Sequence, residues 1–193
     1  MEIKDFIKFY DNTLPPEVIS SFIKYVNKEK FQDAGVVGTK DNPNVIDKTT
    51  RNVQTYILGN VNTMSHIHWT NLFLSVIKKF VGLYENDLKV FCRPAVERVI
   101  NIDVLKYEEG GHYVPHVDHG HMTPRSLSVI YFLNNDYQGG ELHFTDPQDQ
   151  NKSILKVEPV PGRMIVWPSN FVFPHGVSPV KKGKRFVIVS WLL

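Results

Sequence analysis

Residues 104–118 read Val-Leu-Lys-Tyr-Glu-Glu-Gly-Gly-His-Tyr-Val-Pro-His-Val-Asp, and they give the clearest indication of how this chain folds and what it does. The pattern predicts a strand that carries His116 and Asp118 two positions apart. Because side chains alternate between the two faces of a strand, residues two apart point the same way. An imidazole and a carboxylate therefore converge on one point, although two such ligands do not hold a metal without a third.

The best candidate for the third ligand is His175, in the sequence Pro-His-Gly-Val. Two histidines and one carboxylate on one face of a metal ion, with the opposite face open, are typical of non-haem Fe(II) oxygenases. The His-x-Asp pair alone is a weak signal, because other histidines lie close by in the sequence and a solvated loop would show the same pattern. A metal site therefore has to be judged together with the residues that follow His175.

Arg185 follows His175 by ten positions and begins the predicted strand Arg-Phe-Val-Ile-Val-Ser-Trp. Arg185 and Trp191 share one face of that strand. A buried arginine needs a charged partner, and its planar fork suits a carboxylate. A lone arginine at a strand end more often reaches solvent. Beside a candidate metal site, a co-substrate that bears a carboxylate is the better explanation.

The bulk properties predict one globular domain over residues 1–193. The chain is 42% hydrophobic and 22% charged, and it is long enough to bury a full core. A net charge of +2 is too small for an electrostatic nucleic-acid binder, so no nucleic-acid partner is expected. The oligomeric state is left open by the sequence.

The cysteine content and the N-terminal residues indicate the cellular compartment of the protein. The single Cys92 excludes an intrachain disulfide and fits a reducing compartment. The opening Met-Glu-Ile-Lys-Asp-Phe-Ile-Lys carries charges where a signal peptide needs an apolar run. No stretch approaches the roughly 20 apolar residues that span a bilayer. We therefore expect a cytoplasmic protein with no membrane partner, and its small size suggests a bacterial or viral origin.

Hydrophobic spacing predicts two helices followed by many strands. A short strand at 3–10 precedes a helix with an apolar face from Val18 to Val26, and a second helix runs from about 66 to 84. A loop is expected at 32–50 and a strand at 51–58. Further candidate strands lie at 96–107, 112–118, 126–133, 141–144, 153–158, 163–167, 171–175 and 185–192. This order predicts a closed or double-sheet jelly roll supported by helices on one face.

Residues 99–193, roughly, contain several short motifs, each of which occurs once. They are Tyr107-x2-Gly110-Gly111-x-Tyr113-x2-His116-x-Asp118, Arg125-x2-Ser128-x3-Phe132-Leu133-Asn134, Gly139-Gly140-Glu141-Leu142-x-Phe144, Pro161-Gly162 before Trp167-Pro168, and His175-x7-Gly183-x-Arg185-x5-Trp191. Together they resemble the 2-oxoglutarate/Fe(II)-dependent dioxygenases of the prolyl 4-hydroxylase-like branch. The resemblance covers about half of the chain and is highly specific.

The resemblance implies a mainly β fold, a double-stranded β-helix of the jelly-roll or cupin-like kind, with two or more N-terminal helices packed on one face. Helical support would occupy about 1–88 and the β-helix core about 89–193. It implies Fe(II) held by His116, Asp118 and His175. It also implies that 2-oxoglutarate is bound by Arg185, with Tyr107 and Ser128 assisting. Tyr113, Arg125 and Trp191 match positions used at the substrate mouth, although each also suits a purely structural role.

The activity implied is hydroxylation of a prolyl residue in a peptide or protein, coupled to the conversion of 2-oxoglutarate and O2 to succinate and CO2, with ascorbate as a reductant. The same chemistry on a free amino acid or another small molecule is the alternative. From other classes, a zinc-dependent hydrolase and a non-catalytic metal-binding jelly roll remain open. A hydrolase would not need Arg185 at this spacing, and a non-catalytic module would be expected to have lost a ligand.

Two positions depart from the pattern of the family. Ser128 replaces the usual threonine and keeps the hydroxyl. Phe132 replaces the usual tyrosine before Leu-Asn, which removes a hydrogen bond to the co-substrate. Tyr131 points to the opposite face of the strand and is not expected to substitute. The departure at Phe132 leaves open how 2-oxoglutarate is anchored.

Overall fold

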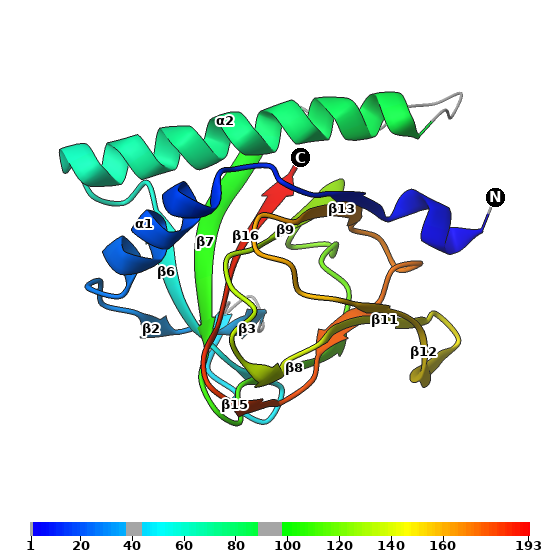
Figure 1. The fold of residues 1–193 in the computed structure, drawn as a ribbon. Helices are drawn as coiled ribbons and strands as arrows, with labels where there is room; N and C mark the ends of the chain where they lie inside the picture. The colour runs from blue at the N-terminus through cyan, green and yellow to red at the C-terminus, as the bar shows by residue number, and fades with distance from the viewer. Residues whose placement is uncertain (1, 38–43, 89–97) are drawn as a thin grey trace.

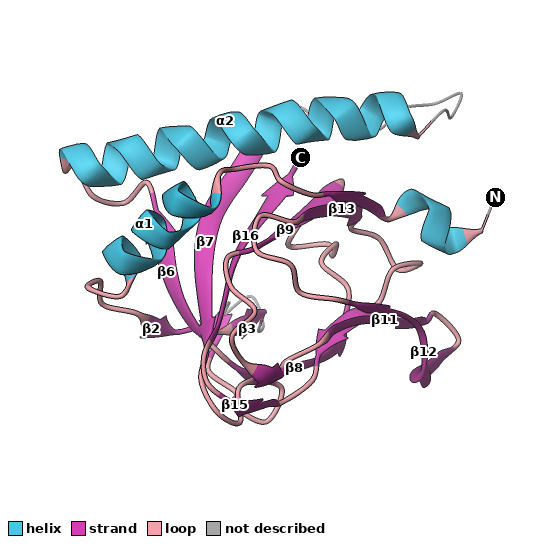
Figure 2. Ribbon diagram, viewed as in Figure 1, coloured by secondary structure: helices cyan, strands magenta, loops and turns pink. Residues whose placement is uncertain are grey.

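The computed structural model describes residues 2–37, 44–88 and 98–193, which form two facing antiparallel sheets with helices on one side (Figures 1 and 2). The larger sheet has the order β1-β13-β9-β16-β7-β6-β2 and the smaller has the order β12-β11-β14-β8-β5. Two short pairs, β3-β4 and β10-β15, lie outside these sheets. The expected double-stranded β-helix with supporting helices is therefore confirmed.

The strands have the following bounds: β1 Lys8–Tyr10, β2 Gln32–Asp33, β3 Val36–Val37, β4 Asn44–Val45, β5 Arg51–Asn52, β6 Gln54–Leu58, β7 Val99–Tyr107, β8 His112–His116, β9 Leu127–Phe132, β10 Gln138–Gly139, β11 Leu142–Asp146, β12 Asp149–Val157, β13 Met164–Pro168, β14 His175–Val177, β15 Val180–Lys182 and β16 Arg185–Leu192. A 3-10 helix at Ile3–Phe6 and the α-helices α1, Pro16–Val26, and α2, Met64–Asp87, complete the structure.

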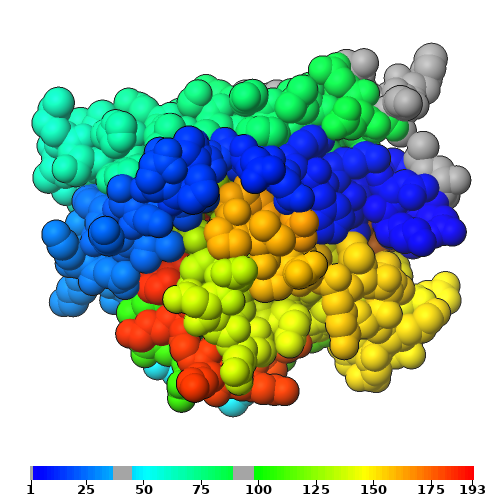
Figure 3. All heavy atoms as spheres, in the orientation of Figure 1, coloured from blue at the N-terminus to red at the C-terminus, as the bar shows by residue number. Residues whose placement is uncertain are grey.

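The two α-helices cover the outer face of the larger sheet. Figure 1 shows α2 lying across the strands, and Figure 3 shows the N-terminal segment directly beneath α2. Phe22 of α1 packs against Phe73 of α2, with ring centroids 4.5 Å apart, and Phe73 in turn contacts Tyr131 of β9. Helix α2 begins where the Thr63 side chain accepts a hydrogen bond from the His66 backbone, which supplies an N-cap. None of the described helices carries a stretch apolar enough to cross a lipid bilayer.

Strand β9 contributes buried side chains to two hydrophobic cores, one on each face of the larger sheet. All six of its residues are buried, because one face meets the helices and the other faces the smaller sheet. Tyr131 belongs to the helix-side core, whereas Phe132 belongs to the core between the sheets. This confirms that the two neighbouring rings point to opposite faces. It also explains why β9 reads as a continuous apolar run rather than as an alternating strand.

Most of the predicted elements match the structure, and the exceptions are short. The predicted strand at 171–175 is wrong over most of its length, because the chain turns there and β14 begins only at His175. The predicted opening strand at 3–10 is a 3-10 helix followed by the three residues of β1. Short strands inside the predicted loop at 32–50, and β10 and β15, were not expected. The start of the predicted strand at 96–107 and the proposed boundary near 89 lie outside the described residues.

The first 58 residues also contribute strands to both sheets. β6 pairs with β7 in the larger sheet, and β5 pairs with β8 in the smaller one. β1 forms the edge of the larger sheet beside β13. The N-terminal part of the chain therefore extends the β-helix as well as supporting it, and it places Arg51 opposite Tyr113 in β8.

Candidate metal centre and adjoining cavity

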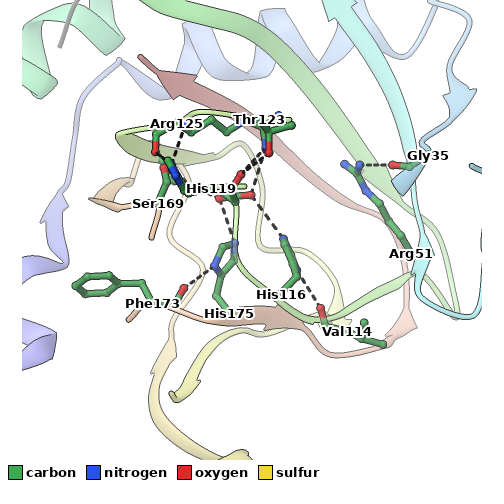
Figure 4. A network of polar contacts seen from close by, with 12 residues as sticks. Gly35, Arg51, Val114, His116, His119, Thr123, Arg125, Ser169, Phe173 and His175 are labelled. Carbon is green, nitrogen blue, oxygen red and sulfur yellow. Dashed lines mark hydrogen bonds and ion pairs between the residues drawn. The ribbon is translucent and has the colours of Figure 1, made fainter. Parts of the chain in front are cut away.

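Three side chains from two neighbouring strands converge between the sheets. His116 ends β8, Asp118 follows two residues later, and His175 begins β14, where it lies directly opposite His116. Their candidate ligand atoms all lie within 4.8 Å of one another. The Asp118 carboxylate lies between the two imidazoles, with Oδ2 at 3.4 Å from His175 Nε2 and Oδ1 at 3.7 Å from His116 Nε2 (Figure 4).

Both imidazoles are held by main-chain carbonyl groups. His116 Nδ1 lies 2.9 Å from the Val114 oxygen, and His175 Nδ1 lies 3.1 Å from the Phe173 oxygen (Figure 4). These carbonyls accept the Nδ1 protons, which leaves each Nε2 with a free lone pair that faces Asp118. A ring nitrogen fixed in this way is the usual arrangement behind a metal-binding histidine.

The pKa shifts of His116 and Asp118 suit a cation. Burial lowers the pKa of His116, and the neighbouring His175 lowers it further. Burial alone would raise the pKa of Asp118, but the two imidazoles and a hydrogen bond from Ser128 hold it below its usual range. His116 therefore offers a neutral imidazole nitrogen and Asp118 an ionised carboxylate at neutral pH, and these are the forms that bind a divalent metal.

Ser128 is placed by the structure beside the candidate ligands rather than beside Arg185. Its Oγ donates to Asp118 Oδ2 at 2.6 Å and lies 2.7 Å from Ser169 Oγ. Ser128 is buried on β9, and Ser169 follows β13. The Ser128 hydroxyl therefore orients the Asp118 carboxylate, and its expected role in co-substrate binding stays a prediction.

A cavity of about 230 Å³ opens from the three side chains and is lined by Tyr107, Tyr113, Arg125 and Trp191, all residues that the sequence predicted at a site. The Arg125 guanidinium lies over the Trp191 ring, 3.7 Å from its centroid. Tyr113 stacks on His116, with ring centroids 3.5 Å apart. These contacts form a rigid aromatic and cationic wall next to the candidate metal centre.

Arg185 lies beside Tyr107, which is one of the residues that line the cavity. It is fully buried, and its Nε, Nη1 and Nη2 atoms all lack a hydrogen-bond partner among the described residues. Its Cζ atom lies 4.7 Å from the centroid of the Tyr107 ring and 5.5 Å from that of Phe132. A buried guanidinium without an acceptor is unfavourable, so this position calls for an anion from outside the chain.

Two cavity residues, Arg51 and Asp103, were missed by the sequence analysis. Arg51 donates to the Gly35 oxygen at 2.7 Å and lies over the Tyr113 ring (Figure 4). Asp103 has a buried oxygen with no partner among the described residues. The period of a strand could have found Asp103, because it shares a face with Tyr107. Nothing in the sequence around Arg51 signals its role.

Asp103 should make the stability of the metal-free protein depend on pH. Burial raises the pKa of Asp103 from 3.8 to about 6, although Arg51 and Arg125 oppose the shift. The contribution of Asp103 to stability is therefore full near pH 4 and is lost as the pH rises through about 6. Relative to wild type, Asp103→Asn should gain roughly 2–3 kcal/mol in unfolding free energy between about pH 4 and about pH 7.

Urea unfolding across this pH range measures the effect of Asp103→Asn. Asp149→Asn, at an exposed carboxylate on β12, is the control and should follow the wild-type profile. A difference between Asp103→Asn and wild type that stays constant with pH would contradict the prediction.

Comparison with known proteins gives a family match in the C-terminal part of the chain. Residues 102–193 match the 2OG-Fe(II) oxygenase superfamily. Prolyl 3-hydroxylase 2 from Homo sapiens is 39% identical over 69 residues, which make up 36% of this chain and 10% of that protein. Prolyl 3-hydroxylase 1 from Gallus gallus is also 39% identical over 69 residues, 9% of its length. The chain thus spans about a tenth of the length of these curated relatives.

Solved structures share the fold over nearly the whole chain. A prolyl hydroxylase from Trichoplax adhaerens, in complex with a hypoxia inducible factor oxygen degradation domain peptide fragment, gives a TM-score of 0.76 at 20% identity and covers 98% of this chain and 84% of that one. A Pseudomonas putida prolyl-4-hydroxylase gives a TM-score of 0.73 at 19% identity and covers 97% of this chain and 92% of its own. At these identities the likeness concerns the fold.

Proposed function

From the match of residues 102–193 to the 2OG-Fe(II) oxygenase superfamily, we propose that this chain is an Fe(II)- and 2-oxoglutarate-dependent dioxygenase that hydroxylates a prolyl residue of a peptide or protein. The observation that carries the proposal is the buried Arg185, whose donors lack an acceptor among the described residues and which lies beside Tyr107 of the cavity at the three convergent ligands. The proposal treats residues 1–193 as one dioxygenase domain.

The residues present fit both cofactors. His116, Asp118 and His175 would hold iron, and Arg185 would bind the distal carboxylate of 2-oxoglutarate, with Tyr107 lining the space between. When bound, iron and 2-oxoglutarate supply the oxidation, in which 2-oxoglutarate and O2 give succinate, CO2 and a hydroxylated substrate carbon. Ascorbate as a reductant that keeps iron ferrous belongs to this proposal.

The protein's own contribution is positioning and exclusion of water. Ser128 holds the Asp118 carboxylate, and main-chain carbonyls fix the tautomers of both histidines. Phe144 and Trp167 pack against the His175 ring, with centroids 5.7 and 5.0 Å away. This apolar packing keeps solvent from one side of the centre, and Arg125 and Trp191 leave the other side for a substrate.

A peptidyl proline suits the aromatic wall of the cavity. Tyr113 and Trp191 line the cavity with apolar ring surface that a pyrrolidine ring can contact, and the Arg125 guanidinium can donate to a peptide carbonyl. The peptide bound to the Trichoplax adhaerens neighbour supports a substrate of this kind.

One observation favours a free amino acid as a second candidate substrate. Asp103 presents a buried oxygen without a partner, and Arg51 and Arg125 line the same cavity. A carboxylate beside two guanidinium groups could receive the ammonium and the carboxylate of a free amino acid. In that case Asp103→Asn would selectively weaken turnover of the free amino acid.

The test of the proposed function is an anaerobic titration of the protein with Fe(II) and then 2-oxoglutarate, followed by visible absorption. Formation of a charge-transfer band, and succinate release on admission of O2 with proline peptides or free proline, are expected. A zinc-dependent hydrolase would instead bind the metal without responding to 2-oxoglutarate. That result would refute the proposal.

A further inference from the structure

A second buried polar group, the hydroxyl of Tyr137, lies near Arg185. Tyr137 lies in the connection between β9 and β10, and its hydroxyl has no hydrogen-bond partner among the described residues. The Tyr137 ring as a whole is only partly buried, so the buried hydroxyl is its inward end. An unpaired buried hydroxyl is unfavourable unless a ligand completes it.

Gly140 brings Tyr137 and Arg185 together. A Cβ atom at Gly140 would lie 3.1 Å from Arg185 Cδ and 3.3 Å from Tyr137 Cε2, so both side chains pack against the bare main chain of this glycine. The φ of +67° at Gly140 is also a conformation that favours glycine. The Gly-Gly turn therefore fixes a tyrosine and an arginine side by side, each with unused donors.

The pKa shift of Tyr137 is consistent with its closeness to Arg185. Burial raises the pKa of Tyr137, and the neighbouring Arg185 opposes that rise. The phenol therefore keeps its proton at neutral pH and can donate. The Tyr137 oxygen can accept from Arg185, but such a contact leaves the Tyr137 O–H and the other Arg185 donors free, and one shared anion would accept from both groups.

On the basis of the proposed function, we infer that the Tyr137 hydroxyl is a second donor to the distal carboxylate of 2-oxoglutarate, beside the Arg185 guanidinium. Phe132, whose ring also borders Arg185, has no donor to offer. Ser128 is engaged with Asp118 at 2.6 Å. A carboxylate accepts more hydrogen bonds than one guanidinium fork supplies, so the Tyr137 hydroxyl fills a free position.

The experiment measures binding rather than turnover. Tyr137→Phe and the wild-type protein, both loaded with Fe(II) under anaerobic conditions, are titrated with 2-oxoglutarate and with 2-oxopentanoate, which has a methyl group in place of the distal carboxylate. Loss of one hydrogen bond to a charged group predicts roughly tenfold weaker binding of 2-oxoglutarate. The affinity for 2-oxopentanoate should not change.

Matched variants make the result specific. Tyr131→Phe removes another buried hydroxyl without a partner, but on the helix side of β9, and it should leave both affinities unchanged. Phe132→Tyr in the Tyr137→Phe background should restore 2-oxoglutarate binding, because it places a hydroxyl beside the same guanidinium.

Two results would overturn the inference while leaving the proposed function intact. One is an unchanged affinity of Tyr137→Phe for 2-oxoglutarate, and the other is an equal loss for both ligands, which indicates a merely structural role. If the wild-type protein binds Fe(II) but not 2-oxoglutarate, the proposed function fails together with the inference.

Discussion

Asp118→Ala is expected to abolish Fe(II) binding and, with it, the release of succinate. The Asp118 carboxylate is the one negatively charged group in the convergent set, and it lies between the Nε2 atoms of His116 and His175. Loss of a group that only orients a ligand typically lowers metal affinity by about 10- to 100-fold, so loss of the ligand itself should have a larger effect.

Thermal unfolding with and without metal measures this effect without any substrate. A metal that binds only the folded state stabilises it by about 2.7 kcal/mol at a free concentration of 100 times Kd. Wild type should therefore melt at a higher temperature when Fe(II) is added anaerobically, whereas Asp118→Ala should not respond. An equal response of the two proteins would mean that the metal is held elsewhere.

Ser128→Ala is a control for Asp118→Ala and is expected to weaken metal binding without abolishing it. It keeps all three ligands and removes the 2.6 Å hydrogen bond to the Asp118 carboxylate together with the contact to Ser169. We expect about 10- to 100-fold weaker metal binding, with the melting response restored at higher Fe(II) concentration. Such a graded loss would distinguish a residue that positions a ligand from the ligand itself.

The fold was predictable from the sequence wherever periodicity was strong and local. The two helices and the long strands carry repeated apolar positions, so their existence follows from the chain alone. Strand β14 was misplaced because 171–175 is apolar yet turns before entering the sheet at His175. The pairing of β10 with β15 depends on contacts between distant segments, which local patterns do not encode.

Site residues could be predicted from the sequence only where they belong to a motif with a characteristic residue type at a fixed spacing. The sequence selected His116, Asp118 and Arg185, and the structure brings the first two to His175 and buries the third without an acceptor. Their roles as ligands for iron and 2-oxoglutarate stay predictions. Arg51 reaches the cavity and Tyr137 reaches Arg185 through the packing of separate segments, which local sequence spacing does not encode.

Arg185→Met should have opposite effects on stability and on co-substrate binding. In the absence of ligand, the Arg185 guanidinium is fully buried with three unpaired nitrogen atoms, and it lies between the rings of Tyr107 and Phe132. Replacing a buried charge by an apolar side chain of similar length is often neutral or stabilising by about 1–4 kcal/mol. The melting temperature of the metal-free variant should therefore equal or exceed that of wild type.

The same substitution should weaken 2-oxoglutarate binding by roughly 30-fold or more, because a hydrogen bond to a charged group contributes about 1.5–3 kcal/mol and the fork supplies two. Anaerobic titration of the Fe(II)-loaded variant measures this loss. Binding of 2-oxopentanoate should be retained or improved, since its methyl end suits the new apolar wall. Arg185→Lys keeps the charge without the planar fork and should fall between wild type and Arg185→Met. A destabilised variant with unchanged 2-oxoglutarate affinity would mean that Arg185 is structural and that the anion binds elsewhere.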